Sequence, residues 1–267
     1  MRIAIGVAYD GRTCAGWQSQ PGGNTIQDRL EAALAAIANA PVRAAAAGRT
    51  DAGVHATGQV AHFDTEAERP ETAWVRGVNA QLPEAIAVQW ARAVEPDFHA
   101  RYSATSRSYA YVLYNHPVRP SVFGGRTGWF HLPLDVDRMR AAADALVGEH
   151  DFSAFRSAEC QAKSPVRVLM RVAVERQGEY VVFKFTANAF LHHMVRNLVG
   201  CLVQTGKGAH PPEWVAEVLG GRDRRLAAPT FGPEGLYLTR VTYPERWNLP
   251  RFAPMLPLFS EPHPDCA

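Results

Sequence analysis

One aspartate in this chain stands where a carboxylate could do chemistry. Asp51 lies between Gly48 and Gly53, so the backbone around it can turn tightly and approach a ligand closely. Arg49 could pair with this carboxylate or hold a phosphate group. A carboxylate kept ionised by such a partner can act as a nucleophile. On residue types alone, the more ordinary interpretation is a turn or cap aspartate beside a surface arginine.

Other chemistries find less support in the residue spacing. His192 and His193 are adjacent, whereas a helical pair of metal ligands lies four residues apart, so we expect no metal site. The glycine-rich stretch 11–23 lacks the Lys-Ser/Thr ending of a phosphate-binding loop. No spacing supports His55 with Cys14 as a catalytic dyad.

The elements that must position these side chains follow from the hydrophobic periodicity. Alternating residues predict strands and residues at helical spacing predict helices, in two successive sets. The first set comprises strands 2–9, 42–47, 59–63 and 87–94 with helices 25–39 and 71–80. The second comprises strands 106–115, 166–176, 180–186 and 236–242 with helices 135–147, 189–204 and 212–219. Asp51 therefore lies in the loop that follows an early strand.

Two sets of strands beside helices predict an α+β fold of two similar halves, in which antiparallel sheets are flanked by helices. We place the N-terminal half at residues 1–104 and the C-terminal half at 105–249. Residues 250–267 contain five prolines and are predicted to form an irregular tail. No low-complexity linker separates the halves, so we expect no freely moving domains.

The charges are distributed unevenly, although the formal net charge is only +2. Three of the 28 basic residues are lysines, and the arginines that dominate suit phosphate binding and base stacking, although codon bias also explains them. Residues 98–134 contain no Asp or Glu but carry four arginines; residues 180–212 also lack acids and carry Lys184, Arg196 and Lys207. These stretches predict either a positive surface for a polyanion or buried elements that are naturally poor in acids.

The composition limits which class of protein this chain can belong to and in which compartment we expect it. Hydrophobic residues make up 47% and charged residues 20%, as in ordinary globular proteins. No apolar run reaches the roughly 18 residues that a membrane span needs, and the N-terminus lacks the layout of a signal peptide. The four cysteines stand singly, which suggests reduced thiols. We therefore expect a cytoplasmic location without membrane attachment.

The run Gly48-Arg49-Thr50-Asp51-Ala52-Gly53-Val54-His55-Ala56 resembles the catalytic motif of the TruA family of tRNA pseudouridine synthases. Further matches follow in the family's order, over about residues 3–243. They are 9–11, 16–18, 24–27, 98–101, 103–109, 152–156, 164–167 and 190–196. Cys14 departs from the pattern, which has an aromatic residue there, and the Pro-rich tail lies outside it.

The resemblance implies an isomerase that converts uridine to pseudouridine. The reaction breaks the N1–C1′ bond of the nucleotide and rejoins the ring through C5, so no redox change occurs and we expect no cofactor. Asp51 is then the catalytic nucleophile. It could attack C1′ of the ribose, add to C6 of the uracil or act as a base at C2′, and the sequence leaves these routes open.

The same resemblance assigns substrate-binding roles to three further residues. Arg196 is the candidate partner of Asp51, on a helix in which His192 would lie one turn earlier. Tyr109 would stack on the flipped target base, and its hydroxyl could relay a proton. Arg49 would splay the RNA or hold a phosphate. Without the resemblance, a surface ion pair and a core tyrosine are the simpler interpretations of Arg196 and Tyr109.

The resemblance also implies the substrate and the assembly. The expected substrate is the anticodon stem-loop of tRNA, at positions 38, 39 and 40, bound in a catalytic cleft between the two halves of each subunit of a homodimer. One alternative is an RNA-binding protein without activity on the same scaffold, which the set of Arg49, Asp51, Tyr109 and Arg196 disfavours. A second alternative is the same chemistry on another RNA.

Overall fold

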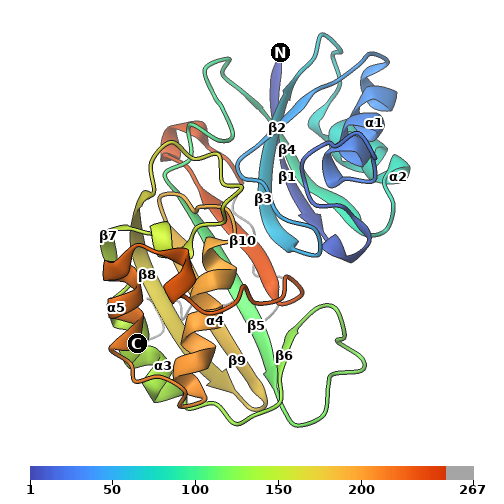
Figure 1. Cartoon of the computed structure of the whole chain (residues 1–267). Coiled ribbons are helices and arrows are strands. Elements are labelled where there is room, and N and C mark those ends of the chain that lie inside the picture. Colours follow the sequence, from blue (N-terminus) through green and yellow to red (C-terminus); the bar gives the residue numbers. More distant parts are fainter. Residues whose placement is uncertain (251–267) are drawn as a thin grey trace, which may run out of the picture. The chain divides into compact units, whose positions relative to one another are not determined.

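The computed structural model describes residues 1–250 and divides the chain into two compact units (Figure 1). The first unit consists of Met1–Thr105 together with the segment that begins at Leu238, and the second is Ser106–Tyr237. The Pro-rich tail predicted from residue 250 lies, beyond Pro250 itself, outside the described residues.

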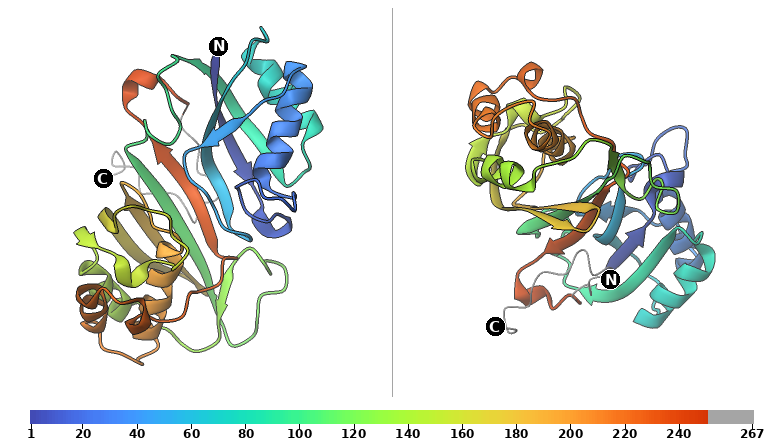
Figure 2. Two further views of the ribbon diagram at one scale, coloured as in Figure 1. Left: turned by 45° about the horizontal axis from the view of Figure 1, so that its top comes forward. Right: turned by 90° about the horizontal axis from the view of Figure 1, so that it is seen from below.

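The first unit is an antiparallel sheet with helices on one face (Figures 1 and 2). Its central strand is β1, whose residues 3–9 are all buried. The strands are β4 (Ile86–Val94), β1 (Arg2–Tyr9) and β3 (His55–Asp64) in spatial order, with the short β2 (Ala44–Ala46) paired to β3. The helical elements are α1 (Ile26–Ala38), a π-helical turn (Ala73–Gly77) and α2 (Val78–Gln81).

Local chemistry sets the ends of α1. The Thr25 hydroxyl accepts a hydrogen bond from the amide of Asp28, and the Asp28 carboxylate accepts one from the amide of Thr25, which makes a capping box. At the other end Asn39 adopts the left-handed conformation, two residues before Pro41. The helix buries Ile26, among others.

The second unit repeats this plan with a longer sheet and three helices on one face (Figure 2). Its strands run β5-β9-β8-β7 in antiparallel order, and the short β6 pairs with β5 in parallel. The bounds are β5 (Ser106–Asn115), β6 (Gly128–Phe130), β7 (Gly148–Asp151), β8 (Val166–Gln177), β9 (Tyr180–Ala187), α3 (Val136–Asp144), α4 (Met194–Gly206) and α5 (Trp214–Gly221).

One strand belongs to both units. β10 (Leu236–Thr242) begins in the second unit and enters the first at Leu238. Within the first unit the carbonyl of Thr239 approaches Gly58 so closely that a Cβ atom there would collide with it. Only glycine fits at position 58 of β3 for this reason. Short 3₁₀ turns lie at Gly11–Thr13, Ser153–Phe155, Arg224–Leu226 and Glu245–Trp247.

The predicted α+β class with antiparallel sheets and flanking helices is confirmed. The bounds predicted for β1, β5 and β10 match those of the structure. The short β6 and β7 were not predicted, because three or four residues carry too little periodicity to be recognised. Among residues 1–250, no helix has the length and apolar character needed to cross a membrane.

The predicted start of the helix that carries Arg196 is wrong. α4 begins at Met194 and not at residue 189, because His193 has a positive φ of 63° and breaks the helical path. The Asn188 side chain accepts hydrogen bonds from the amides of Val168 and Ala189, which holds the preceding segment in a non-helical connection. His192 therefore does not lie one helical turn before Arg196.

A buried histidine supports the end of the first unit's sheet. His62, on β3, is 6% exposed, and its Nδ1 accepts a hydrogen bond from the amide of Ala100 at 3.2 Å. Burial is the main cause that lowers the pKa of His62, to about 4, with further lowering from His99 and Arg2 and an opposing effect of Asp64. The neutral ring is therefore the native form at neutral pH.

This pKa predicts a pH dependence of stability. In the unfolded chain a histidine titrates near ~6.5, so between about pH 6.5 and 4 the unfolded state binds the extra proton. The stabilisation is present in full above pH ~6.5 and is lost as the pH falls toward 4. We expect urea unfolding to show a smaller loss of stability between pH 7 and 5 in His62→Gln than in the wild type. Equal losses in both proteins would contradict this.

Candidate active site

The Asp51 side chain projects from a tight turn. The amide of Val54 donates to the carbonyl of Asp51 at 3.1 Å, and Gly53 has a φ of 79°, a conformation that favours glycine. Asp51 is half-buried and Arg49 is exposed. The carboxylate is thus presented near the surface by a turn whose shape depends on Gly53.

Buried hydrogen bonds fix this turn to the sheet. The hydroxyls of Thr50 and Tyr9 are 2.8 Å apart, and Nε2 of Gln59 donates to the carbonyl of Gly48 at 2.7 Å. Gln59 is fully buried on β3, next to Tyr9 on β1. Burial raises the pKa of Tyr9 well above its ordinary value, although Thr50 and Gln59 lower it in part, so the phenol stays protonated. The residue next to Asp51 is therefore bonded to the core.

A second set of contacts ties the turn to the start of α1. The amide of Trp17 donates to the carbonyl of Thr50 at 3.0 Å, and the carbonyls of Gly16 and Trp17 accept from the amides of Ile26 and Gln27. Gly16 has a φ of 84°, and a Cβ atom there would lie 2.7 Å from the Thr50 oxygen. Gly16 thus permits the close approach of two backbone segments.

The strand that follows the turn begins with a buried histidine. Nδ1 of His55 accepts from the amide of Gly11 at 3.2 Å and lies 3.3 Å from Oδ1 of Asp10. Burial raises the pKa of Asp10, but hydrogen bonds from Arg12 and the nearby His55 outweigh it and lower the pKa to about 2. Asp10 is therefore ionised, and His55 joins the end of β1 to the start of β3.

Tyr109 lies on β5 of the second unit. Its ring is 9% exposed and meets the ring of Phe190 edge to face, with centroids 5.0 Å apart. Tyr111 stands two residues later, so both rings point to the same face of the sheet. Tyr109 is thus buried, although less completely than Tyr111, which has no exposed surface.

Arg196 is oriented by a segment that follows α5. Its Nε donates to the carbonyl of Phe231 at 2.8 Å, and its own carbonyl accepts from the amide of Phe231. The Phe231 ring packs edge to face against Tyr111 at 5.6 Å. Arg196 is therefore held on the face of the sheet from which Tyr109 and Tyr111 project.

A polar residue next to Arg196 anchors α4 and was not identified from the sequence. Asn197 is fully buried; its Nδ2 donates to the carbonyl of Phe155, and its Oδ1 accepts from Thr230 and Arg224. An asparagine within an apolar helical stripe was the only signal for it. Gln59, equally unidentified, stands in the apolar strand 59–63 and offered the same kind of signal.

The structure thus groups the predicted residues by unit. Arg49 and Asp51 lie in the first unit, and Tyr109 and Arg196 lie in the second. His55, near the end of the family-like motif, contacts Gly11 and Asp10.

Two basic residues of the acid-free stretches do not form an open positive surface. Arg107 is buried and donates to the carbonyl of Asn188, and Lys184 is almost buried and pairs with Glu175 at 3.0 Å. Part of the acid-free pattern therefore reflects buried strands. Arg101, Arg119, Arg126 and Lys207 are exposed.

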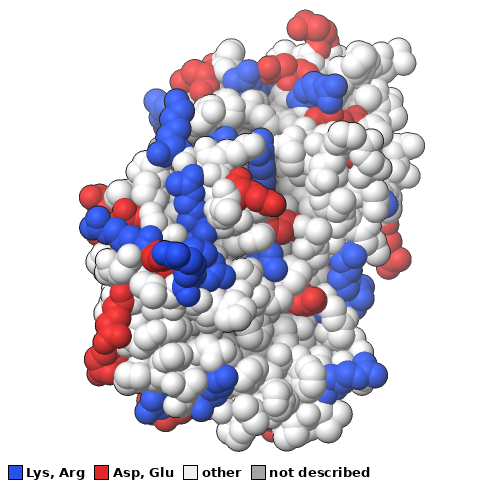
Figure 3. Space-filling view, in the orientation of Figure 1, with Lys and Arg blue, Asp and Glu red and all other residues white. Residues whose placement is uncertain are grey.

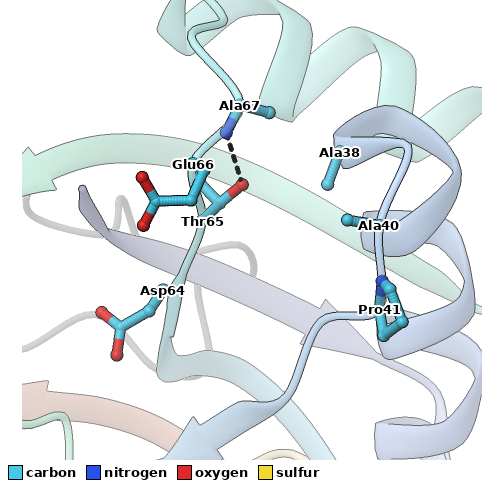
Figure 4. Close-up of a pocket in the computed structure, with 7 residues that line it drawn as sticks. All are labelled: Ala38, Ala40, Pro41, Asp64, Thr65, Glu66 and Ala67. Atoms are coloured by element: carbon cyan, nitrogen blue, oxygen red, sulfur yellow. Dashed lines mark hydrogen bonds between the residues drawn. The ribbon is translucent and has the colours of Figure 1, made fainter.

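A hollow in the first unit lies at the C-terminal end of β3, whereas the turn that carries Asp51 lies at its N-terminal end (Figure 4). Asp64, at the strand terminus opposite to His55, lines it together with Glu66. Ala38, Ala40, Pro41, Thr65 and Ala67 complete the lining. Two carboxylates at this hollow disfavour a polyanionic ligand.

Comparisons with known proteins agree with the resemblance seen in the sequence. The model of a family described as tRNA pseudouridine synthase matches residues 5–103 and 142–244. A tRNA pseudouridine synthase A of Paraburkholderia xenovorans (strain LB400) is 59% identical over 249 residues, 93% of this chain and 92% of that protein. One of Burkholderia cenocepacia (strain HI2424) is 58% identical over 250 residues, 94% and 93% of the two chains.

A solved Cbf5-Nop10-Gar1 complex also contains a similar chain. It aligns with a TM-score of 0.37 and 15% identity, and covers 88% of this chain and 48% of that one.

The hydrogen bonds beneath the turn predict a local effect of one hydroxyl. Tyr9→Phe leaves the Thr50 hydroxyl without its bond to Tyr9, so we expect faster amide hydrogen exchange at residues 48–54 and a loss of about 1 kcal/mol in stability. Tyr243→Phe is the matched control, because it removes a bond from a tyrosine hydroxyl to the carbonyl of Ala100 in the same unit. It should leave exchange at 48–54 unchanged. Similar exchange in both variants would show that the network does not hold the turn.

Proposed function

This chain belongs to the tRNA pseudouridine synthase family, and we propose that it isomerises uridines 38, 39 and 40 in the anticodon stem-loop of tRNA. The family's enzymes are isomerases, and so is this chain. One observation carries the proposal for the site: the half-buried Asp51, within the run that resembles the family's catalytic motif, is presented by a turn that Thr50 bonds to the core. The substrate positions follow from the resemblance alone.

Asp51 is proposed as the nucleophile. In the reaction the glycosidic N1–C1′ bond breaks, the uracil turns while it remains bound, and C5 forms the new bond to C1′. The proton of C5 is lost to solvent and N1 takes up a proton from solvent, so the product is an isomer of the substrate. A fixed turn favours this chemistry, because the carboxylate then needs no reorganisation to reach the nucleotide. Attack at C1′, addition to C6 and proton abstraction at C2′ remain alternative routes for the same carboxylate.

Three further residues are proposed to bind the substrate. Tyr109 offers a ring whose edge-to-face contact with Phe190 fixes its plane, as a stacked uracil requires. Arg196 offers a guanidinium whose Nε is already bonded to Phe231, so its direction is set in advance. Arg49 is exposed next to Thr50 and is suited to a phosphate. No cofactor enters this scheme, because the rearrangement is redox-neutral.

The proposal also assigns the site residues to the two halves of the chain and specifies the location and assembly of the protein. Residues 1–104 supply Asp51 and Arg49, while residues 105–249 supply Tyr109 and Arg196. We propose a cytoplasmic homodimer that binds tRNA mainly through its phosphates. Basic side chains gather over the second unit on the face seen in Figure 3, which supports an electrostatic contribution to binding.

Release of tritium from tRNA that contains 5-³H-uridine tests this function directly. The wild-type chain should release tritium from an unmodified tRNA transcript, and mapping of the product should find pseudouridine at positions 38, 39 or 40. Release with modification elsewhere would retain the chemistry and overturn the proposed positions. Absence of release from tRNAs with uridines at all three positions would overturn the function itself.

Asp51→Asn is the decisive variant in this assay. We expect turnover to fall at least a thousandfold while the Kd for tRNA changes less than threefold, because phosphate contacts elsewhere supply most of the affinity. Asp10→Asn is a control, because it alters a second carboxylate near the same turn. The carboxylate of Asp10 contacts Arg12 and His55. Residual activity of Asp51→Asn within tenfold of the wild type would remove this residue from the chemistry.

Substitution of Tyr109 separates its two possible roles. If stacking dominates, Tyr109→Phe keeps most activity, and Tyr109→Ala loses the roughly 1–3 kcal/mol that base–aromatic stacking contributes. If the hydroxyl transfers a proton, Phe fails almost as severely as Ala. Single-turnover rates at saturating tRNA distinguish the two. An Ala variant that equals the wild type would place Tyr109 outside the site.

A further inference from the structure

Tyr102 is an exposed aromatic residue on a rigid turn of the first unit. Its side chain is 75% exposed, the highest value among the aromatic residues of the described chain. The turn closes on itself, because the amide of Ser103 donates to the carbonyl of His99 and the amide of His99 donates to the Ser103 hydroxyl, both at 2.9 Å. The ring is therefore displayed to solvent by an ordered backbone.

The Tyr102 ring has a support beneath it. Its centroid lies 4.3 Å from that of His99, which in turn lies 4.6 Å from that of the buried His62. Nδ1 of His99 accepts from the amides of Arg101 and Tyr102, at 3.1 and 3.4 Å, so the imidazole cannot rotate without loss of these bonds. Three rings thus lead from the core to the surface, and Tyr102 is the outermost.

A cation lies beside this ring. The guanidinium carbon of Arg101 is 5.6 Å from the centroid of Tyr102, within the range of a cation–π contact. No Asp or Glu occurs from residue 98 to 134 of the sequence. Of the carboxylates near the three rings, that of Asp64 is neutralised by an ion pair with Arg2 at 2.8 Å. An exposed aromatic face next to a basic group suits a nucleobase and its phosphate.

We propose that Tyr102 is a stacking platform for an unpaired base of the RNA that this chain binds, with Arg101 at the phosphate of the same nucleotide. The proposal rests on the proposed function for the identity of the RNA and adds a binding site apart from Tyr109. The ring is already ordered in the absence of a ligand, so stacking costs little conformational entropy. Charge complementarity favours RNA over a second protein chain as the occupant.

The experiment measures equilibrium binding of an unmodified tRNA transcript to the full chain and to three variants, Tyr102→Phe, Tyr102→Leu and Tyr102→Ala. Phe keeps the ring, while Leu keeps an apolar side chain without an aromatic face. Loss of one base–aromatic stack corresponds to a roughly 5- to 150-fold weaker Kd. We expect Phe within twofold of the wild type and both Leu and Ala at least fivefold weaker. Val147→Ala, at another exposed apolar position, should bind as the wild type does.

Several outcomes overturn the platform. They are an Ala variant that binds within twofold of the wild type, a Leu variant that binds as well as Phe, and a Phe variant as weak as Ala. Sedimentation of each variant without RNA gives a further check, since a change in self-association would assign Tyr102 to a contact between copies of the chain. Unchanged unfolding temperatures verify that the variants fold.

Tritium release separates this proposal from the one on which it rests. If the platform is correct, Tyr102→Ala raises the tRNA concentration needed for half-maximal turnover and leaves the single-turnover rate at saturation nearly unchanged. A wild-type chain that binds tRNA without release would overturn the proposed function, and the binding series would still decide the platform.

Discussion

The bond between the hydroxyls of Thr50 and Tyr9 constrains the geometry of the first unit's candidate site. This bond lies in the interior, and Asp51 directly follows Thr50 in the chain. Because the two residues share a peptide bond, a large displacement of the Asp51 backbone would break the buried hydrogen bond. An unpaired buried hydroxyl costs about 1–3 kcal/mol, which is a large fraction of the stability of a domain. The turn is therefore held by hydrogen bonds to the strands that carry Tyr9 and Gln59.

Glycines make this arrangement possible. Gly53 supplies the positive φ that the turn requires, and Gly16 lets a second backbone segment pass against the carbonyl of Thr50. Because that segment also bonds to the first residues of α1, helix and turn share one set of hydrogen bonds. In the second unit, hydrogen bonds likewise hold the elements of the candidate site. The buried Asn197 fixes α4, and the carbonyl of Phe231 orients the guanidinium of Arg196.

The basic residues of the chain serve two purposes that net charge does not distinguish. Arg107 and Lys184 satisfy a carbonyl and a carboxylate within the second unit, and their charges are not open to a ligand. Arg101 instead lies on an exposed turn beside Tyr102. An arginine-rich composition thus predicts RNA binding only after the buried arginines and lysines are set apart. Rigid aromatic and basic groups on the surface fit a ligand that is recognised by shape and backbone.

The sequence by itself determined the elements whose signals are local. The alternation in β1 and β5 and the helical spacing of α1 required no distant partner, and the run around Asp51 identified the family through a contiguous string of residues. Tertiary structure decided what depends on residues far apart in the chain. It placed the start of α4 at Met194, because Asn188 bonds to the backbone of β8, 20 residues earlier in the chain. It likewise paired Gln59 with the turn at Gly48 and stacked Tyr102 on His99 and His62. A polar residue in an apolar strand has the same local pattern whether its side chain is bonded or not, and only the folded chain supplies the partner.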